Sequence, residues 1–116
     1  MALSLKTLYA DTLGNSEALL YPNPASQATK NALIKNFILT NKSGSAATVN
    51  LRLRKSNTAT YVQVSPKDLS IPAGGQVVLD AEITIDLNQS TPNAIYGGAS
   101  ATTAIDCIIN GLERDV

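Results

Sequence analysis

Hydrophobic and polar residues alternate along much of this 116-residue chain, and the dominant period is two residues. The clearest example lies at residues 46–55, where Val49, Leu51 and Leu53 alternate with polar residues. Successive side chains of a strand point to opposite faces, so this pattern predicts a strand with one apolar face. A similar run at residues 31–41 precedes it, and Lys, Ser and Gly fill the short segment between them. The two runs together predict an antiparallel hairpin.

The first strand of this predicted hairpin carries apolar residues on both faces. Leu33, Phe37 and Leu39 share one parity, and Ile34 and Ile38 share the other. A strand in a two-sheet sandwich needs only one buried face. Exposed apolar surface in a soluble protein commonly marks an interface. We therefore expect Ile34 and Ile38 to lie together on the outer face and to contact another subunit.

Strand patterns and turn signals recur along the rest of the sequence, and no segment has a convincing helical period. The sequence Ile71-Pro72-Ala73-Gly74 fits a type I turn with Pro72 at its second position. Gly97-Gly98 predicts a bulge or a close approach of two backbones. We expect one all-β domain over residues 1–116, an antiparallel β-sandwich of about eight strands with jelly-roll or immunoglobulin-like connectivity. Outside the predicted hairpin, the strand-like runs lie near residues 3–9, 17–21, 58–64, 69–71, 76–79, 82–87, 94–100 and 102–112.

The charge balance limits the classes of partner. The charges of nine basic and nine acidic residues cancel. The chain therefore lacks the concentrated positive charge that attracts nucleic acid and anionic membranes. No segment reaches the roughly 18 apolar residues of a membrane span. We therefore expect neither a nucleic-acid nor a membrane partner. Aromatic residues make up only 4% of the chain, which predicts an aliphatic core.

The sequence offers little catalytic chemistry. It contains no histidine, which excludes Ser-His-Asp and Cys-His catalysis and removes the commonest metal ligand. Cys107 is the only cysteine and shares its parity with Ile105 and Ile109, so we expect a buried, inert thiol and no intrachain disulfide. Acidic residues at 80, 82 and 86 share a parity, but carboxylates spaced along a strand diverge and do not form a calcium site. We expect no catalytic residue, no metal, no cofactor and no enzymatic activity.

The remaining candidates are interaction residues. Arg52 and Arg54 belong to a basic cluster that is too small for nucleic-acid binding, and we expect them to pair with acidic residues 80, 82 or 86 across strands or between subunits. They are therefore candidates for the subunit interface, with Ile34 and Ile38. Tyr61 and Tyr96 are candidates for contact with a glycan or a protein partner, because aromatic rings serve both.

Five phrases of the sequence occur in a familiar order. They are "LY" at 8–9, "YPNP" at 21–24, "KNFILTNKSG" at 35–44, "IPAG" at 71–74 and "VLD" at 78–80. This set resembles small β-sandwich virion structural proteins of tailed bacteriophages, which are associated with the tail, baseplate, neck or fibres or decorate the capsid.

The resemblance implies a non-enzymatic virion subunit that is made in the host bacterial cytoplasm. It also implies symmetric packing with copies of itself, with a trimer favoured, and contact with other virion structural proteins. An alternative stays open at this point. The chain could instead be a carbohydrate-binding or host-receptor-recognition module, with a surface glycan as its partner.

Overall fold

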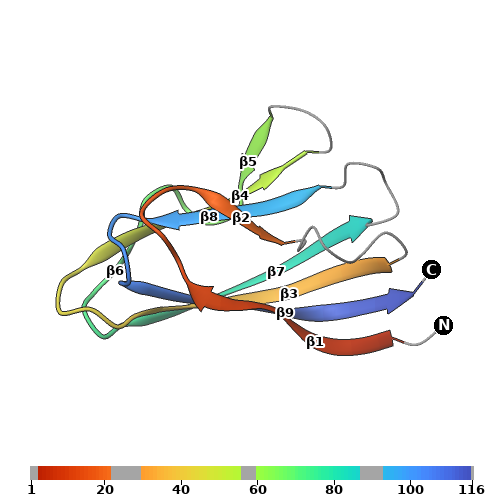
Figure 1. Cartoon of the computed structure of the whole chain (residues 1–116), viewed down its shortest axis with the longest axis horizontal. Helices are drawn as coiled ribbons and strands as arrows, with labels where there is room; N and C mark the ends of the chain where they lie inside the picture. Colours follow the sequence, from red (N-terminus) through yellow and green to blue (C-terminus); the bar gives the residue numbers. More distant parts are fainter. Residues whose placement is uncertain (1–2, 22–29, 56–59, 87–92, 116) are drawn as a thin grey trace.

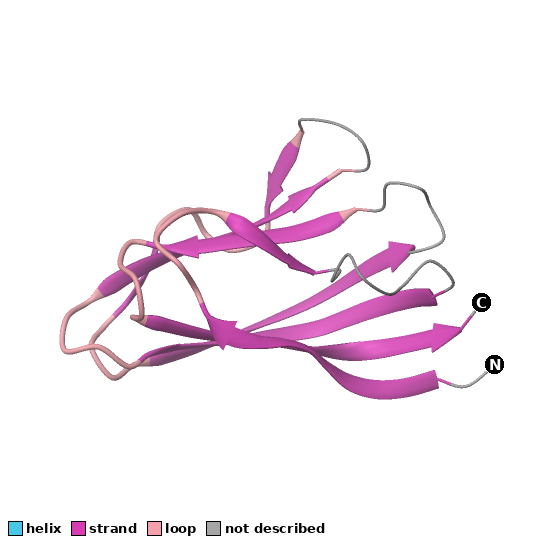
Figure 2. Ribbon diagram, in the orientation of Figure 1, coloured by secondary structure: helices cyan, strands magenta, loops and turns pink. Residues whose placement is uncertain are grey.

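The computed structural model describes residues 3–21, 30–55, 60–86 and 93–115. Within these residues the chain forms nine β-strands and no helix (Figures 1 and 2). The strands form two antiparallel sheets that pack face to face as two layers. The prediction of an all-β antiparallel sandwich is therefore confirmed.

One layer is a four-stranded sheet and the other is a five-stranded sheet. The four-stranded sheet has the order β1 (Leu3–Thr12), β9 (Ile105–Asp115), β3 (Lys30–Asn41) and β7 (Gln76–Asp86). The five-stranded sheet has the order β2 (Ala18–Tyr21), β8 (Ala94–Ala99), β4 (Ala47–Arg54) and β5 (Tyr61–Gln63), and β6 (Leu69–Ile71) also pairs with β4.

The connectivity is that of a jelly roll. β5 pairs with the end of β4 at Arg52–Arg54 and β6 pairs with its beginning at Ala47–Val49, so the two together act as one interrupted strand. Apart from the step from β4 to this interrupted strand, consecutive strands alternate between the two sheets. This arrangement is typical of the two Greek keys of a jelly roll, so it decides between the two predicted connectivities.

The predicted hairpin of residues 31–41 and 46–55 is wrong. β3 pairs with β7 and β9 in one sheet, whereas β4 pairs with β5, β6 and β8 in the other. Asn41 is fully buried at the end of β3, where its Nδ2 donates hydrogen bonds to the carbonyl oxygens of Ser45 and Ile71. These bonds turn the chain from one sheet into the other. An alternating pattern shows which face of a strand is buried but not which strand it pairs with.

A β-bulge in β3 moves Ile34 to the inner face. The pairing of β3 with both neighbours shifts between Ile34 and Asn36. Against β9 the shift leaves Lys35 as an extra residue. Such an extra residue reverses the parity of the side chains that follow it. Ile34 is consequently buried in the core, while Ile38 lies on the outer face. The prediction that these two residues share a face is wrong.

The turn before β7 also differs from the prediction. The Gly75 amide donates a hydrogen bond of 2.8 Å to the Pro72 carbonyl oxygen, so Pro72 is the first residue of the turn. Gly74 takes the third position with a φ of 71°, which is typical of a type II turn and favours glycine. The predicted type I turn is therefore wrong by one residue in position and in type.

The core between the sheets is aliphatic, as expected. Val49 and Leu51 are fully buried, and so is the Cys107 thiol. A Cβ atom at Gly98 would lie 2.9 Å from the Ser16 carbonyl oxygen and 3.1 Å from the Glu17 amide nitrogen, which confirms the predicted close approach of two backbones at Gly97-Gly98. The largest fully buried side chains are those of Phe37, Leu13, Ile34, Leu39, Leu51, Ile71, Ile85, Ile95, Ile105, Ile109, Val49 and Asn41.

Candidate functional site

Two arginines and two tyrosines gather on the outer face of the five-stranded sheet. Arg52 lies opposite Tyr96 in the pairing of β4 with β8, and Arg54 lies opposite Tyr61 in the pairing of β4 with β5. The tyrosine rings meet edge to face, with centroids 5.6 Å apart. The Arg52 guanidinium carbon lies 4.5 Å from the centroid of the Tyr61 ring, within cation–π range. We call these four residues the Arg–Tyr cluster.

Both arginines of this cluster are held as cations. Arg52 donates from Nε and Nη2 to the two carboxylate oxygens of Glu17, each at 2.6 Å, and this hydrogen bonding raises the pKa of Arg52. Arg54 donates to the Tyr96 hydroxyl at 3.4 Å, which raises the pKa of Arg54. The bidentate pair with Glu17 on the loop before β2 fixes the Arg52 guanidinium over the Tyr61 ring.

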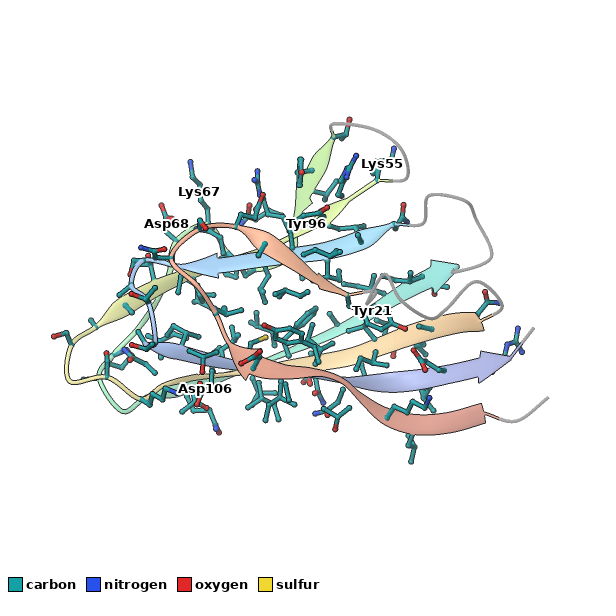
Figure 3. All side chains as sticks on the ribbon, in the orientation of Figure 1. Tyr21, Lys55, Lys67, Asp68, Tyr96 and Asp106 are labelled. Carbon is teal, nitrogen blue, oxygen red and sulfur yellow. The ribbon has the colours of Figure 1, made fainter. Side chains whose placement is uncertain are left out.

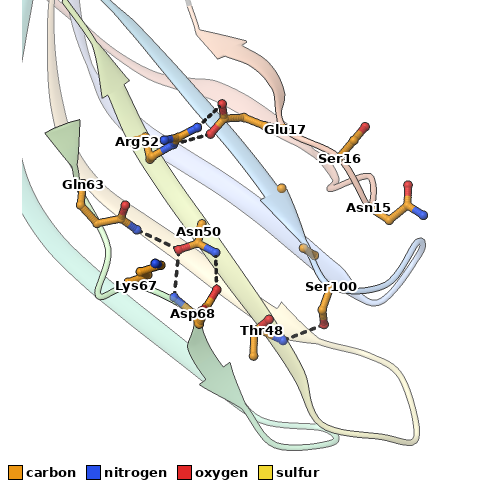
Figure 4. A pocket seen from close by; sticks show the side chains of 12 residues that line it. Asn15, Ser16, Glu17, Thr48, Asn50, Arg52, Gln63, Lys67, Asp68 and Ser100 are labelled. Atoms are coloured by element: carbon orange, nitrogen blue, oxygen red, sulfur yellow. Dashed lines mark hydrogen bonds and ion pairs between the residues drawn. The ribbon is translucent and has the colours of Figure 1, made fainter. Parts of the chain in front are cut away.

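A polar groove of about 430 Å³ adjoins this cluster on the same face. Its floor is organised by Asn50, whose Oδ1 accepts from Gln63 Nε2 and from the Asp68 amide, both at 2.9 Å (Figure 4). Asn50 Nδ2 donates in return to Asp68 Oδ1 at 2.8 Å. The other lining residues are Asn15, Ser16, Glu17, Thr48, Arg52, Lys67, Gly98, Ala99 and Ser100.

The chemistry of this groove is hydrogen bonding. Amides, hydroxyls, two carboxylates and two cations line it, and they suit a ligand that is itself rich in hydroxyl or amide groups. In the described part of the chain, no group of three or more His, Cys, Asp or Glu side chains could hold a metal ion.

The outer face of the four-stranded sheet carries a second candidate surface, with apolar and polar residues in alternating rows. One apolar row contains Leu5, Leu112 and Leu33, and the other contains Ala10, Ile108, Ile38 and Val78. Leu5 is 83% exposed and Val78 is 51% exposed. The polar row between them contains Thr7, Asn110, Asn36 and Asp80. We call this surface the striped face.

Asp106 marks one end of the striped face, and it projects away from the five-stranded sheet (Figure 3). Its carboxylate accepts a hydrogen bond from the Thr12 hydroxyl at 2.6 Å and lies 3.0 Å from Lys42 Nζ. These two contacts lower the pKa of Asp106. The end of the face therefore carries a fixed anion.

The structure distributes the predicted interface residues over three places. Ile34 has no exposed surface, so it cannot contact another subunit of the folded protein. Ile38 lies in an apolar row of the striped face, on one side of the sandwich. Arg52 and Arg54 lie on the opposite side, and Arg52 pairs with Glu17 rather than with an acidic residue of β7. Across β3 and β7, Glu82 pairs instead with Lys35 at 3.3 Å.

The predicted glycan or partner contacts are brought together. Tyr61 and Tyr96 belong to strands on either side of β4, and the register of both strands against β4 lets their rings meet across it. The other tyrosines lie elsewhere, and Tyr21 is buried with its hydroxyl donating to Glu113. Sequence reasoning missed Glu17, Asn50 and Asp68, because single polar residues in loops and on strand faces form no motif.

The fold and its two exposed surfaces define a jelly-roll domain with candidate interaction faces on both sheets. Neither protein-family models nor curated proteins give a match to the chain. Similar solved structures are those of infectious bursal disease virus. A chain of its T13 viral particle has a TM-score of 0.59 and 8% identity, over 97% of this chain and 30% of that chain.

Two further structures agree with this similarity. The Gt strain of the same virus gives a TM-score of 0.50 at 8% identity, and the Gx strain gives 0.50 at 11% identity. Each covers 97% of this chain, whereas the chain spans only 30% and 32% of their lengths. At such identities the similarity establishes the fold. No helix among the described residues is long and apolar enough to cross a membrane.

Proposed function

We propose that the chain is a non-enzymatic structural subunit of a virus particle and packs symmetrically with copies of itself. The observation that carries the proposal is the striped face, where two aliphatic rows cross all or most of a sheet, with exposed side chains at the edges and half-buried ones between them. Exposed apolar surface of this extent is typical of a protein interface. The fold supports the proposal, because the chains of similar fold belong to viral particles.

The finer assignment rests on the sequence phrases that resemble tailed-bacteriophage proteins. On that basis the particle is a bacteriophage virion, the subunit is made in the bacterial cytoplasm, and a trimer is the favoured oligomer. The fold does not choose between a tail, baseplate, neck or fibre position and capsid decoration, because the similar structures belong to a different kind of virus.

The experiment for this proposal is a stoichiometric protein analysis of virus particles purified from the culture that carries the gene. We expect peptides of this chain in many copies per particle, in a fixed ratio to the other structural proteins. The absence of the chain from purified particles would overturn the proposal. Light scattering after size exclusion then measures the native mass, for which a trimer is three times the chain mass of 12.2 kDa.

A second candidate function is recognition of a surface glycan or host receptor, and the Arg–Tyr cluster beside the polar groove favours it. Binding sites for sugars combine an aromatic face with fixed hydrogen-bonding groups. Arg52 and Tyr96 both contact the Tyr61 ring, and the side chain is still 36% exposed, which leaves ring surface on which a sugar could stack.

Glycan binding can be tested separately on an array of bacterial surface glycans. We expect Tyr61→Ala to abolish binding and Tyr61→Phe to retain it, because only the first removes the ring. Equal binding by both variants, or no binding by the wild-type protein, would exclude this second candidate.

A further inference from the structure

The outward residues of β9 have the same order of residue types from either end of the strand, except that the charges at the two ends have opposite signs. They are Asp106, Ile108, Asn110, Leu112 and Arg114, that is, an anion, an aliphatic residue, an amide, an aliphatic residue and a cation. Asn110 stands at the centre, with an apolar side chain two residues away on each side.

The neighbouring strands extend this order across the sheet. Ile108 lies opposite Ala10 on β1 and Ile38 on β3, and Leu112 lies opposite Leu5 and Leu33 on the same two strands. These are the two apolar rows of the striped face. Asn110 lies between Thr7 and Asn36 in the polar row. The whole face is therefore arranged about the level of Asn110.

We infer that the striped face binds a second copy of this chain, face to face, about a two-fold axis that passes beside Asn110 and runs across the strands. This inference rests on the proposed function and names a self-contact for such a subunit. An isologous two-fold contact closes a dimer, so it stands in place of the trimer that the sequence resemblance favours. The axis reverses the strand direction of the second copy. Ile108 of one copy then meets Leu112 of the other, and Asp106 of one copy meets Arg114 of the other.

Hydrogen bonding fits the same axis. Asn110 Nδ2 donates to Asn36 Oδ1 at 3.1 Å, so the centre of the polar row is a pair of side-chain amides. An amide carries both donors and an acceptor, and such a pair can bond to an identical pair related by a two-fold axis. The row contains one unfavourable neighbour, since the two Asp80 carboxylates approach each other at the edge. Lys35 and Glu82 line the same hollow as Asp80, and their ion pair at 3.3 Å places a cation near this edge.

The size of the face is sufficient for a stable dimer. Four strands at about 4.8 Å spacing and eleven residues at about 3.3 Å each give a face of roughly 19 by 36 Å, or about 700 Å² per copy. Stable interfaces of standard size bury about 600–1,000 Å² per partner, a range that includes this face. A two-fold axis along the strands would use the same area, but it would place the Asp106 ends of both copies at one level and the Arg114 ends at the other. Lys42 and Thr12 both contact Oδ1 of Asp106, which leaves Oδ2 for Arg114 of the other copy. The axis across the strands also keeps the two Arg114 side chains apart, so charge complementarity favours it.

Cysteine cross-linking tests the position of the axis. With a short bismaleimide, we expect the Asn110→Cys protein to form a covalent dimer, because each copy of residue 110 faces its counterpart. The matched control is Arg114→Cys, on the same strand and face, whose counterpart lies about 26 Å away along the strand. Wild-type protein controls for the buried Cys107. No cross-link at position 110, or an equal cross-link at position 114, would overturn the proposed axis.

Charge reversal provides a second, independent measurement. We expect Asp106→Arg and Arg114→Asp each to weaken dimerisation at least tenfold, as measured by light scattering over a dilution series. The double variant restores the pair with its charges exchanged, so we expect it to dimerise more tightly than either single variant. A double variant no tighter than the singles would contradict the inference. If the chain is present in particles but fails these tests, only the two-fold contact is wrong; if it is absent from particles, the proposed function is wrong.

Discussion

Asn41 Nδ2 donates a hydrogen bond of 2.9 Å to the Ile71 carbonyl oxygen, and this bond joins the end of β3 in one sheet to β6 in the other. The same amide nitrogen donates to the Ser45 carbonyl oxygen at 2.8 Å. Its Oδ1 accepts from the Ser43 amide at 2.9 Å and the Ser43 hydroxyl at 2.7 Å. A single buried side chain thus holds the passage between the layers.

Replacement of this side chain is expected to be costly. Asn41→Ala removes the side-chain partner of the Ile71 carbonyl oxygen and of the Ser43 amide, and leaves the Ser45 carbonyl oxygen only its bond from the Ser43 hydroxyl. We therefore expect the free energy of unfolding to fall by about 3 kcal/mol. Urea denaturation measures it. Asn15→Ala, at an exposed asparagine on the rim of the polar groove, is the matched control and should change stability by less than about 0.5 kcal/mol. A change of that small size for Asn41→Ala would mean that the corner is held by the backbone alone.

A second expected effect concerns Gly111, which lies in β9 beside the bulges of both neighbouring strands. A Cβ atom there would approach the Leu33 carbonyl oxygen to 2.2 Å and a Leu8 methyl carbon to 2.9 Å. Backbone cannot move aside cheaply, so we expect Gly111→Ala to destabilise the protein by about 2 kcal/mol or more. Thermal unfolding monitored by circular dichroism measures the loss.

The matched control for this effect is Gly14→Ala, because no atom lies within 4 Å of a Cβ at Gly14. Equal melting temperatures for the two alanine variants would show that β9 and β3 can separate locally without cost. That result would weaken the assignment of the bulges as fixed features.

The alternation of apolar and polar residues predicts which face of a strand is buried, and this limits how much of the fold the sequence predicts. The parity of β4 and β9 correctly placed Val49, Leu51 and Cys107 in the core, because each strand keeps an unbroken period of two. Parity failed for Ile34 in β3, because the bulge at Lys35 adds a residue relative to β9 without any compositional mark. The partner of a strand is not encoded by parity at all, and so β3 and β4 were paired wrongly.

The candidate sites were likewise predictable where they depend on the face of one strand, and not where they depend on which strands are neighbours. The contact of Tyr61 with Tyr96 depends on β5 and β8 flanking β4, which only the sheet order reveals. The sequence predicts part of the striped face, because the alternation along β9 shows which of its residues point outward. Its alignment with β1 and β3 requires the register of three strands.

Leu51 and Ile38 offer a direct test of the inner and outer faces. Leu51 is fully buried between the sheets, so Leu51→Asp places an unpaired charge in the core and should abolish folding. Ile38→Asp places the same charge on the striped face and should leave the fold intact while weakening self-association. Circular dichroism and light scattering separate the two effects. Loss of the folded signal in Ile38→Asp would show that Ile38 belongs to the core.

The Cys107 thiol should be chemically inert in the folded protein. Desolvation by burial raises the pKa of Cys107 to about 12, so the reactive thiolate is scarce near neutral pH. We expect no reaction with a thiol-specific disulfide reagent at pH 8, and complete reaction once guanidinium unfolds the chain. Rapid labelling of the native protein would show that β9 opens locally.

Asp106 should contribute to stability in a way that depends on pH. Hydrogen bonds from Thr12 and Lys42 lower the pKa of its carboxyl group below the ordinary value of 3.8. Because the folded pKa is the lower one, this contribution is fully present above the unfolded value and is lost as the pH falls through the folded pKa. Asp106→Asn removes the titration, so its stability should fall less steeply below pH 4 than that of the wild type. Urea unfolding between pH 2 and pH 6 measures both slopes, and parallel curves would mean that Lys42 and Thr12 give the carboxylate no net preference for the charged state.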